Sequence, residues 1–314
     1  MNLDKELNIM CICGKLYNRV LKIIMILPCE HMFHEECLKK NKIEFCPICK
    51  IEIESKKSLL DDVKTKEDLQ RYSDIISISN FCSLSSYKIH NVIDNLFDIG
   101  KLFMTAPFCK GIKESRNVIK KFLSLNNTNV YVRGLDRINP KEKKVFICNH
   151  SSYLDFMIVL LFLDTYFLAS DFINQSIITS SLSKIIPLLI IKRGTSNNTV
   201  EQMKQFVEKY GSICVFPEGM ITHPDTIIKF RTGGFYVGEP IYPIILRYKQ
   251  MKNDFNIGTF LAKSSSRYHT EIYMDIIGPY NPPFSKNDIE KIRQDMANVG
   301  NMLTSRVSSR DIID

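Results

Sequence analysis

The sequence lacks a long apolar run, a low-complexity tract and an internal repeat. Its longest apolar runs, residues 156–163 and 185–191, are far shorter than the about 20 residues that a membrane-spanning helix needs. Near the N-terminus, Asp4, Lys5 and Glu6 stand where a secretory leader would have its apolar segment. We therefore expect neither a transmembrane helix nor a secreted protein.

The sequence also lacks a block of residues that all carry the same charge. The net charge is +8, but Lys and Arg are dispersed along the 314 residues. Such a balance suits nucleic acid, an anionic membrane surface or a phosphorylated substrate. Dispersed charge without a recognition helix argues against nucleic acid. Six of the ten cysteines lie between Cys11 and Cys49, and without a leader we expect reduced, cytosol-facing thiols.

The chain divides into four regions. Residues 1–52 hold a Cys/His cluster, 53–80 form a charged linker, 81–125 are amphipathic, and 126–314 alternate strand-like with helix-like segments. This alternation predicts an α/β fold with a mostly parallel sheet flanked by helices. We expect strands at residues 130–133, 145–148, 166–169, 188–191, 213–216, 241–246 and 271–277, and helices at 152–163, 198–210 and 286–303.

The amphipathic region has a basic helix after an apolar segment. One face of this helix holds Ile112, Ser115, Ile119 and Phe122, and the other holds Lys113, Arg116, Lys120 and Lys121. The pattern fits a helix lying in a membrane interface and also a surface helix of a soluble domain. The segment alone favours the surface helix.

The N-terminal cluster consists of four closely spaced pairs of donors. They are Cys11, Cys13, Cys29, His31, His34, Cys37, Cys46 and Cys49. Eight soft or borderline donors are enough for two tetrahedral zinc ions. A module of ~40 residues cannot fold on its core alone, so we expect metal binding to supply much of its folding free energy.

The stretch LPCEHMFHEECLKKNKIEFCPICK resembles a RING-H2 finger. The resemblance implies one zinc held by Cys11, Cys13, His34 and Cys37, and a second held by Cys29, His31, Cys46 and Cys49. The spacing Cys11-x-Cys13 is one residue shorter than in that family. Apolar residues Ile12, Pro47 and Ile48, with Lys50 after the last ligand, match the surface that binds a ubiquitin-conjugating enzyme. Tryptophan, often found there, is absent, and the same scaffold also serves as a plain interaction module.

Four short motifs follow in order in the last region, each at a strand end or at the start of the next strand. They contain His150 with Asp155 (HSSYLD), Lys192 with Arg193 (KRG), Glu218 with Gly219 (FPEG), and Pro243 (EPIYP). Open α/β sheets place their sites at this edge. Singly, each motif has an ordinary structural explanation: a helix cap, a solvated strand end or a turn. Together and in order, they indicate a site.

The residue types suggest the chemistry. His150 can act as a general base if a carboxylate holds its other ring nitrogen. Asp155 can do so only if His150 lies in the turn before a helix and Asp155 in its first turn. Lys192 and Arg193 offer charge for a phosphate, and Glu218 can accept hydrogen bonds from substrate hydroxyls.

These motifs resemble those of the PlsC-like glycerophospholipid acyltransferases, which share the HX4D motif. The resemblance implies that His150 deprotonates an acceptor hydroxyl, which attacks an acyl-CoA thioester, while Asp155 orients the histidine. It also implies that the blocks with Lys192, Arg193, Glu218, Gly219 and Thr222 bind the glycerophosphate part of the acceptor. The block with Pro243 lines the acyl-CoA side.

Details of the third block are nearer the lysophosphatidylcholine acyltransferase branch. Met220 replaces the threonine of the usual FPEGT, and Thr222 falls where that branch has its second threonine. The resemblance implies a lysophospholipid, glycerol phosphate or lysophosphatidic acid as acceptor. It also shifts the preferred interpretation of residues 81–125 to membrane association, peripheral or monotopic, on the cytosolic side of an ER-like membrane. The alternative is a membrane-docked ubiquitin ligase or adaptor with a non-catalytic acyltransferase fold.

Overall fold

The computed structural model describes the fold of part of the chain. It covers residues 23–27, 29, 32–40, 43–47, 49–58, 66–67, 69–70, 73–74, 77, 112–125, 128–152, 154–170, 188–191, 198–250 and 270–313. Among the predicted site residues, Cys11, Cys13, His31, Lys192 and Arg193 lie outside these ranges, as does all of residues 81–111. No helix within these ranges is long and apolar enough to cross a membrane.

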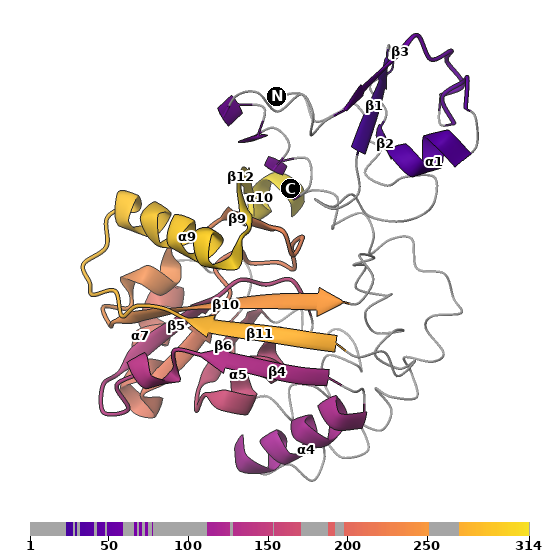
Figure 1. Ribbon diagram of the computed structural model, residues 1–314. Helices are drawn as coiled ribbons and strands as arrows, with labels where there is room; N and C mark the ends of the chain where they lie inside the picture. The colour runs from indigo at the N-terminus through magenta and orange to yellow at the C-terminus, as the bar shows by residue number, and fades with distance from the viewer. Residues whose placement is uncertain are drawn as a thin grey trace.

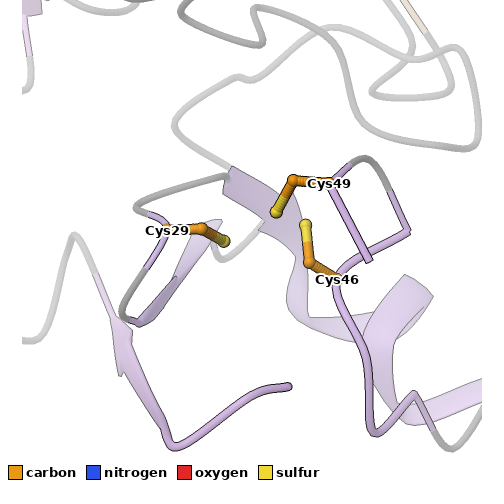
Figure 2. A group of neighbouring side chains, drawn as sticks. All are labelled: Cys29, Cys46 and Cys49. Carbon is orange, nitrogen blue, oxygen red and sulfur yellow. The ribbon is translucent and has the colours of Figure 1, made fainter. Parts of the chain in front are cut away.

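A small N-terminal module precedes the main sheet (Figure 1). It contains β1 (Ile23–Leu27), β2 (Met32–His34), α1 (Glu35–Lys40) and β3 (Ser55–Ser58), and its strands pair antiparallel in the order β2-β1-β3. Its core is small, with Ile26 and Phe33 fully buried. Three cysteine side chains of this module point toward one another (Figure 2).

The main domain is built on a seven-stranded sheet of order β4-β11-β10-β5-β8-β6-β7. Only the β10–β11 pair is antiparallel. The strands are β4 (Thr128–Arg133), β5 (Lys144–Cys148), β6 (Tyr166–Ser170), β7 (Leu188–Ile191), β8 (Ser212–Val215), β10 (Ile241–Gln250) and β11 (Thr270–Ile276). Each of the seven predicted strands is present, and the α/β fold with a mostly parallel sheet is confirmed.

Helices cover both faces of this sheet (Figure 1). One face packs against α4 (Ile112–Leu125) and α5 (Asp155–Phe162), and the other against α7 (Thr199–Tyr210) and α9 (Lys286–Gly300). Strand β5 is buried along its whole length because successive side chains point to opposite, equally covered faces. Two short 3-10 turns, Leu135–Arg137 and Gly233–Tyr236, complete the loops.

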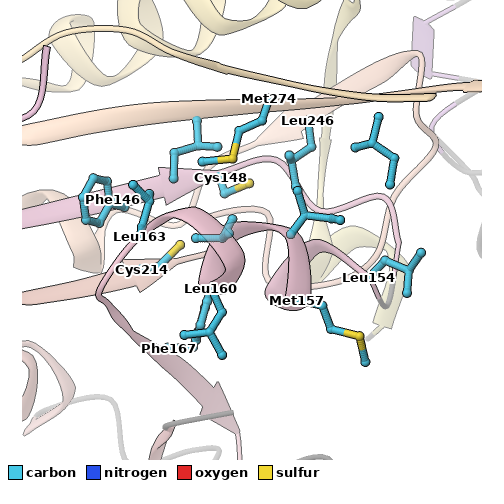
Figure 3. Packing of buried hydrophobic residues seen from close by; sticks show 14 of the residues in the cluster. Phe146, Cys148, Leu154, Met157, Leu160, Leu163, Phe167, Cys214, Leu246 and Met274 are labelled. Atoms are coloured by element: carbon cyan, nitrogen blue, oxygen red, sulfur yellow. The ribbon is translucent and has the colours of Figure 1, made fainter. Parts of the chain in front are cut away.

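The core under α5 fixes the start of that helix. Met157, Ile158, Val159 and Leu160 are all buried, so α5 is apolar around its circumference rather than on one side. Figure 3 shows α5 residues packed against side chains from the strands, including Cys148, Cys214 and Leu246. Truncating a fully buried leucine here costs about 2–5 kcal/mol of unfolding free energy. The first residue of α5 is therefore held in place by a large core.

Helix α4 belongs to this core. Ile119 and Leu123 are buried in it, and Arg116 donates from Nε to the carbonyl of Leu160 (2.7 Å) and pairs with Asp164 (2.8 Å). The apolar face that the resemblance assigned to a membrane interface is thus covered by the protein. The surface-helix interpretation describes residues 112–125 better, because amphipathicity shows that a face is buried but not what buries it. The predicted start of the acyltransferase domain at residue 126 falls after a helix that packs into it.

A second, two-stranded sheet lies on the C-terminal side and was not predicted. Strands β9 (Thr226–Lys229) and β12 (Leu303–Ser308) pair in parallel, and the short α10 (Ser309–Ile313) follows. The predicted helix to residue 303 ends instead at Gly300, because Asn301 turns left-handed with φ 51°. At its start, Ser285 and Asp288 form a capping box.

Part of the predicted linker docks on β12. The Asp74 carboxylate accepts hydrogen bonds from Arg306 N (2.6 Å), Arg306 Nε (2.9 Å) and Ser305 Oγ (2.9 Å). Ser73 and Ser77 are buried and bond to Thr304 O and Ser305 Oγ. These residues of 53–80 are therefore part of the folded structure rather than a solvated connection.

Candidate active site

The site begins where β5 leaves the sheet. Asn149, directly after β5, is buried, and its side chain bonds to β10 as a strand would: Nδ2 donates to Leu246 O (3.0 Å) and Oδ1 accepts from Leu246 N (2.7 Å). The amide side chain thus satisfies the neighbouring strand while the backbone turns away. This turn places His150 at the edge of the sheet. Asn149 is not among the predicted site residues, because its only signal in the sequence is an amide that follows an apolar strand.

His150 and Asp155 meet in the geometry that the sequence requires of a working pair. Asp155 is the first residue of α5, and its Oδ2 lies 2.8 Å from His150 Nδ1. The same oxygen accepts hydrogen bonds from the backbone N–H groups of Ser151 (2.8 Å) and Ser152 (2.9 Å). Asp155 therefore holds the turn before α5 and contacts the histidine ring through the same oxygen, while the N-cap of α5 is Leu154, which makes no side-chain cap bond.

The imidazole of His150 has apolar walls. The ring of Phe216 lies 4.3 Å from it between centroids, and the ring of Phe156 packs edge-on at 5.4 Å. His150 is only 9% exposed. With Nδ1 turned to Asp155, Nε2 is the ring nitrogen left to exchange a proton with a substrate.

Glu218 faces His150 from the loop after β8. It is fully buried: Oε1 accepts from His150 N (2.8 Å), and Oε2 accepts from Ile228 N (3.1 Å) and Thr222 Oγ1 (2.7 Å). Both oxygens are thus occupied by the protein, whereas the sequence predicted contacts with substrate hydroxyls. Burial raises the pKa of Glu218 to about 7, against the lowering effect of its hydrogen bonds to His150, Thr222 and Ile228.

Thr222 hydrogen-bonds to the backbone carbonyl of His150. Its backbone N–H donates to His150 O at 2.7 Å, and its hydroxyl lies 3.2 Å from that carbonyl. The loop from Glu218 to Thr222 therefore grips both the N–H and the C=O of His150. The predicted residues Glu218 and Thr222 are brought to the site, where they contact the backbone of His150.

The backbone explains why glycine stands at position 219 and why proline is tolerated at position 243. Gly219 has φ 74°, and a Cβ there would lie 2.6 Å from Arg231 Nε. Pro243 pairs with Ile147 of β5 and lies just before the first β10–β11 partner, Ile244, so its missing N–H interrupts no bond to β11. The predicted pair Lys192 and Arg193 follows β7, which ends at Ile191 and runs parallel to β6.

Two cysteines near the site are not nucleophiles. Cys148 on β5 and Cys214 on β8 are fully buried, as their apolar strands predict. Burial raises the pKa of each thiol well above its ordinary value, and the Asp155 charge adds to this. A thiol in such surroundings stays protonated and unreactive.

The N-terminal module holds a second group of functional side chains. The Sγ atoms of Cys29, Cys46 and Cys49 all lie within 4.8 Å of one another (Figure 2). These three belong to one of the two predicted ligand sets. His34 on β2 and Cys37 on α1, assigned to the other set, are described but do not join this group.

Comparison with known proteins bears on the main domain. Residues 129–247 match the family described as "Acyltransferase". This part of the chain, from β4 into β10, is similar to that family. The matched segment includes His150, Asp155, Glu218 and Pro243, so the geometry described above lies inside it.

Curated relatives are lysophospholipid acyltransferases. Lysophosphatidylcholine acyltransferase 1 of Homo sapiens is 24% identical over 166 residues, which cover 49% of this chain and 31% of that protein. A lysophospholipid acyltransferase of Arabidopsis thaliana is 24% identical over 195 residues, covering 55% and 48%. The chain thus spans less than half the length of either relative. The crystal structure of the 1-acyl-sn-glycerophosphate acyltransferase PlsC from Thermotoga maritima aligns with a TM-score of 0.45 and 16% identity, over 68% of this chain and 95% of that one.

Proposed function

We propose that the protein transfers an acyl group from acyl-CoA to the free hydroxyl of a lysophospholipid, with His150 as general base. The observation that carries this is the 2.8 Å contact between His150 Nδ1 and the buried Asp155 carboxylate, inside the acyltransferase-family domain. The names of the curated relatives support a lysophospholipid as acceptor.

The chemistry follows from the free ring nitrogen. His150 Nε2 takes the proton of the acceptor hydroxyl as its oxygen attacks the thioester carbonyl. The C–S bond then breaks, the new ester forms, and the imidazolium returns its proton to the leaving thiolate of CoA. The Asp155 carboxylate contacts Nδ1 and would stabilise the imidazolium between these two transfers. No acyl-enzyme is needed, in keeping with the inert Cys148 and Cys214.

Substrate contacts are proposed from the motifs. Arg193 and Lys192 suit the phosphate of the acceptor because a guanidinium fork and an ammonium both pair with phosphate oxygens. The turn at Gly219 and the strand around Pro243 would border the substrates at the same edge of the sheet. Glu218 and Thr222 contribute by gripping the backbone of His150.

A lysophospholipid panel tests this function. The purified chain is incubated with an acyl-CoA and lysophospholipids that differ in headgroup, and products are identified by mass. We expect a new diacyl product with wild-type protein and none with His150→Ala, while the two proteins melt at similar temperatures. Equal release of free CoA by both proteins would contradict the proposal.

We propose further that the N-terminal module is a RING-type zinc module. Zinc bound by thiolates at about 2.3 Å places the sulfur atoms about 3.8 Å apart. The three cysteines within 4.8 Å of one another fit this geometry, and His31 would complete the set. Cys11, Cys13, His34 and Cys37 would hold the second ion. Metal analysis should find close to two zinc ions per chain; one ion would show that the short Cys11/Cys13 pair does not bind.

Membrane association remains part of the proposal because both substrates carry acyl chains. We expect the protein to bind peripherally or monotopically to ER-like membranes on the cytosolic side, through residues 81–111 and the basic face of α4. Flotation with anionic vesicles, compared with neutral ones, measures this.

A ubiquitin-conjugating enzyme is the partner to test for the zinc module. The assay is ubiquitin transfer, with Ile48→Ala as the control variant.

A further inference from the structure

Asp155 has a second carboxylate oxygen, and it is held from a distant strand. Tyr248 on β10 donates its hydroxyl to Asp155 Oδ1 across 93 residues of sequence. The other oxygen, Oδ2, is shared by His150, Ser151 and Ser152. Asp155 is fully buried, so an Oδ1 without Tyr248 would be a desolvated charge with no donor among the described residues.

The Tyr248 hydroxyl keeps its proton and can therefore donate a hydrogen bond to Asp155. Burial raises the pKa of Tyr248 well above its ordinary value, and the neighbouring Asp155 charge raises it further. Ser152 makes a side-chain hydrogen bond to the same phenol, and its Oγ also accepts from Leu154 N (3.1 Å). Ser152 thus donates to the Tyr248 oxygen, and Tyr248 donates to Asp155.

Two points of attachment fix the plane of the carboxylate. Rotation about the Cβ–Cγ bond would move Oδ2 relative to His150 Nδ1 and to its backbone donors, Ser151 N and Ser152 N, so these contacts already restrain the carboxylate from one side. A donor on Oδ1 restrains the same rotation from the opposite oxygen. The orientation of the imidazole then depends on β10, although the bond between Tyr248 and His150 is indirect.

We propose that Tyr248 is a positioning residue for the His150–Asp155 pair, holding Asp155 Oδ1 so that Oδ2 stays aligned with His150 Nδ1. The effect on catalysis rests on the proposed acyl transfer. The alternative is that Tyr248 only fills the core with its ring, since the ring packs against the same cluster as α5.

Tyr242 offers a matched control. It lies on the same strand, six residues earlier, and therefore on the same face of the sheet. Its hydroxyl also donates to a carboxylate, that of Glu142, at the other end of the strand. Tyr242→Phe thus removes the same kind of bond from the same core without touching Asp155.

Kinetics separate positioning from packing. Tyr248→Phe should lower kcat about 10-fold to 100-fold, with KM for acyl-CoA and lysophosphatidylcholine within about twofold of wild type, because the lost bond involves a buried charge. Tyr242→Phe should leave kcat near the wild-type value. In an Asp155→Ala background, Tyr248→Phe should cause no further loss, because the group it holds is gone.

Three results would overturn the proposal: an unchanged kcat in Tyr248→Phe, an equal loss in Tyr242→Phe, or the same loss in the Asp155→Ala background. A proton signal provides a readout independent of activity. The Nδ1–H of His150 should resonate far downfield in 15N-histidine-labelled protein and vanish in His150→Ala. It should broaden or shift in Tyr248→Phe but not in Tyr242→Phe. An inactive wild type that shows this pattern would reject acyl transfer and keep the positioning role; an active wild type without it would do the reverse.

Discussion

The two functional regions of this protein are held in place by different means. At the sheet edge, His150 is held by residues next to a large core: the side chains of Asp155 and Glu218 and the backbone N–H of Thr222. In the N-terminal module, three thiols converge in a fold whose core is small. Packing can fix a site in the first region, whereas the proposed zinc would hold the donors of the second together. Disturbing each kind of support should therefore affect one region and spare the other.

The largest effect is expected from metal removal. Structural zinc contributes on the order of 10 kcal/mol to folding small modules. A strong chelator should therefore expose residues 23–58 to protease and hydrogen exchange, while the seven-stranded sheet keeps its protection. Cys46→Ser should act in the same way, and Cys214→Ser, in the main core, serves as the reverse control. Unchanged protection of the module after chelation would show that it folds without metal.

Asp155→Asn should give the next largest effect, on activity. The amide can present its oxygen to Ser151 and Ser152, but it no longer supplies the charge that stabilises an imidazolium. We expect kcat to fall about 1,000-fold or more with little change in KM. The assay is product mass at saturating substrates, and circular dichroism confirms the fold. A loss below about 10-fold would argue against His150 as the base.

Stability should depend on pH through Glu218. Its pKa, raised from 4.5 to about 7 by burial, means that the folded state holds the proton more tightly than the unfolded chain. The associated stability is present below pH 4.5 and is lost as the pH rises through 7, by about 3 kcal/mol in total. Glu218→Gln, measured by denaturant unfolding from pH 5 to 8, should flatten this slope. Glu201→Gln, an exposed change on α7, should not.

The smallest effect is predicted for the Thr222 hydroxyl. Thr222→Val keeps the shape and the backbone N–H that bonds to His150 but removes the donor to Glu218. We expect about 1–2 kcal/mol less unfolding free energy and a kcat lowered a few-fold. Thr222→Ser should retain both properties. If Val and Ser behave alike, the backbone bond alone holds His150.

Local patterns predicted most of the sheet. The seven strands are short apolar runs, and burial on both faces makes such runs recognisable. Strand β12 was missed because its sequence LTSRVS is polar, and its place depends on partners elsewhere: β9 and the segment around Asp74. For α4, the periodicity identified the buried face but not the protein surface that covers it.

The sequence identified the motifs of the candidate site but not the directions in which their side chains point. Ser152-x-x-Asp155 placed the carboxylate in the first turn of α5, since helical geometry fixes that relation locally. Glu218, however, turns to the backbone of His150, and no spacing in the sequence indicates that. Asn149 and Tyr248 act on partners 97 and 93 residues away, so only the folded sheet identifies them.

The docking of Asp74 on β12 has a consequence for the order of folding. It joins residues 232 positions apart, and closing so long a loop is slow compared with forming the neighbouring βα units. We therefore expect the segment around Asp74 to dock late and to hold β12 against β9 only after the seven-stranded sheet has formed. Because β12 lies beside β9, whose Ile228 N–H bonds to Glu218, that late step would also complete the grip on His150. A folding intermediate stalled before it would be compact yet lack a properly seated His150.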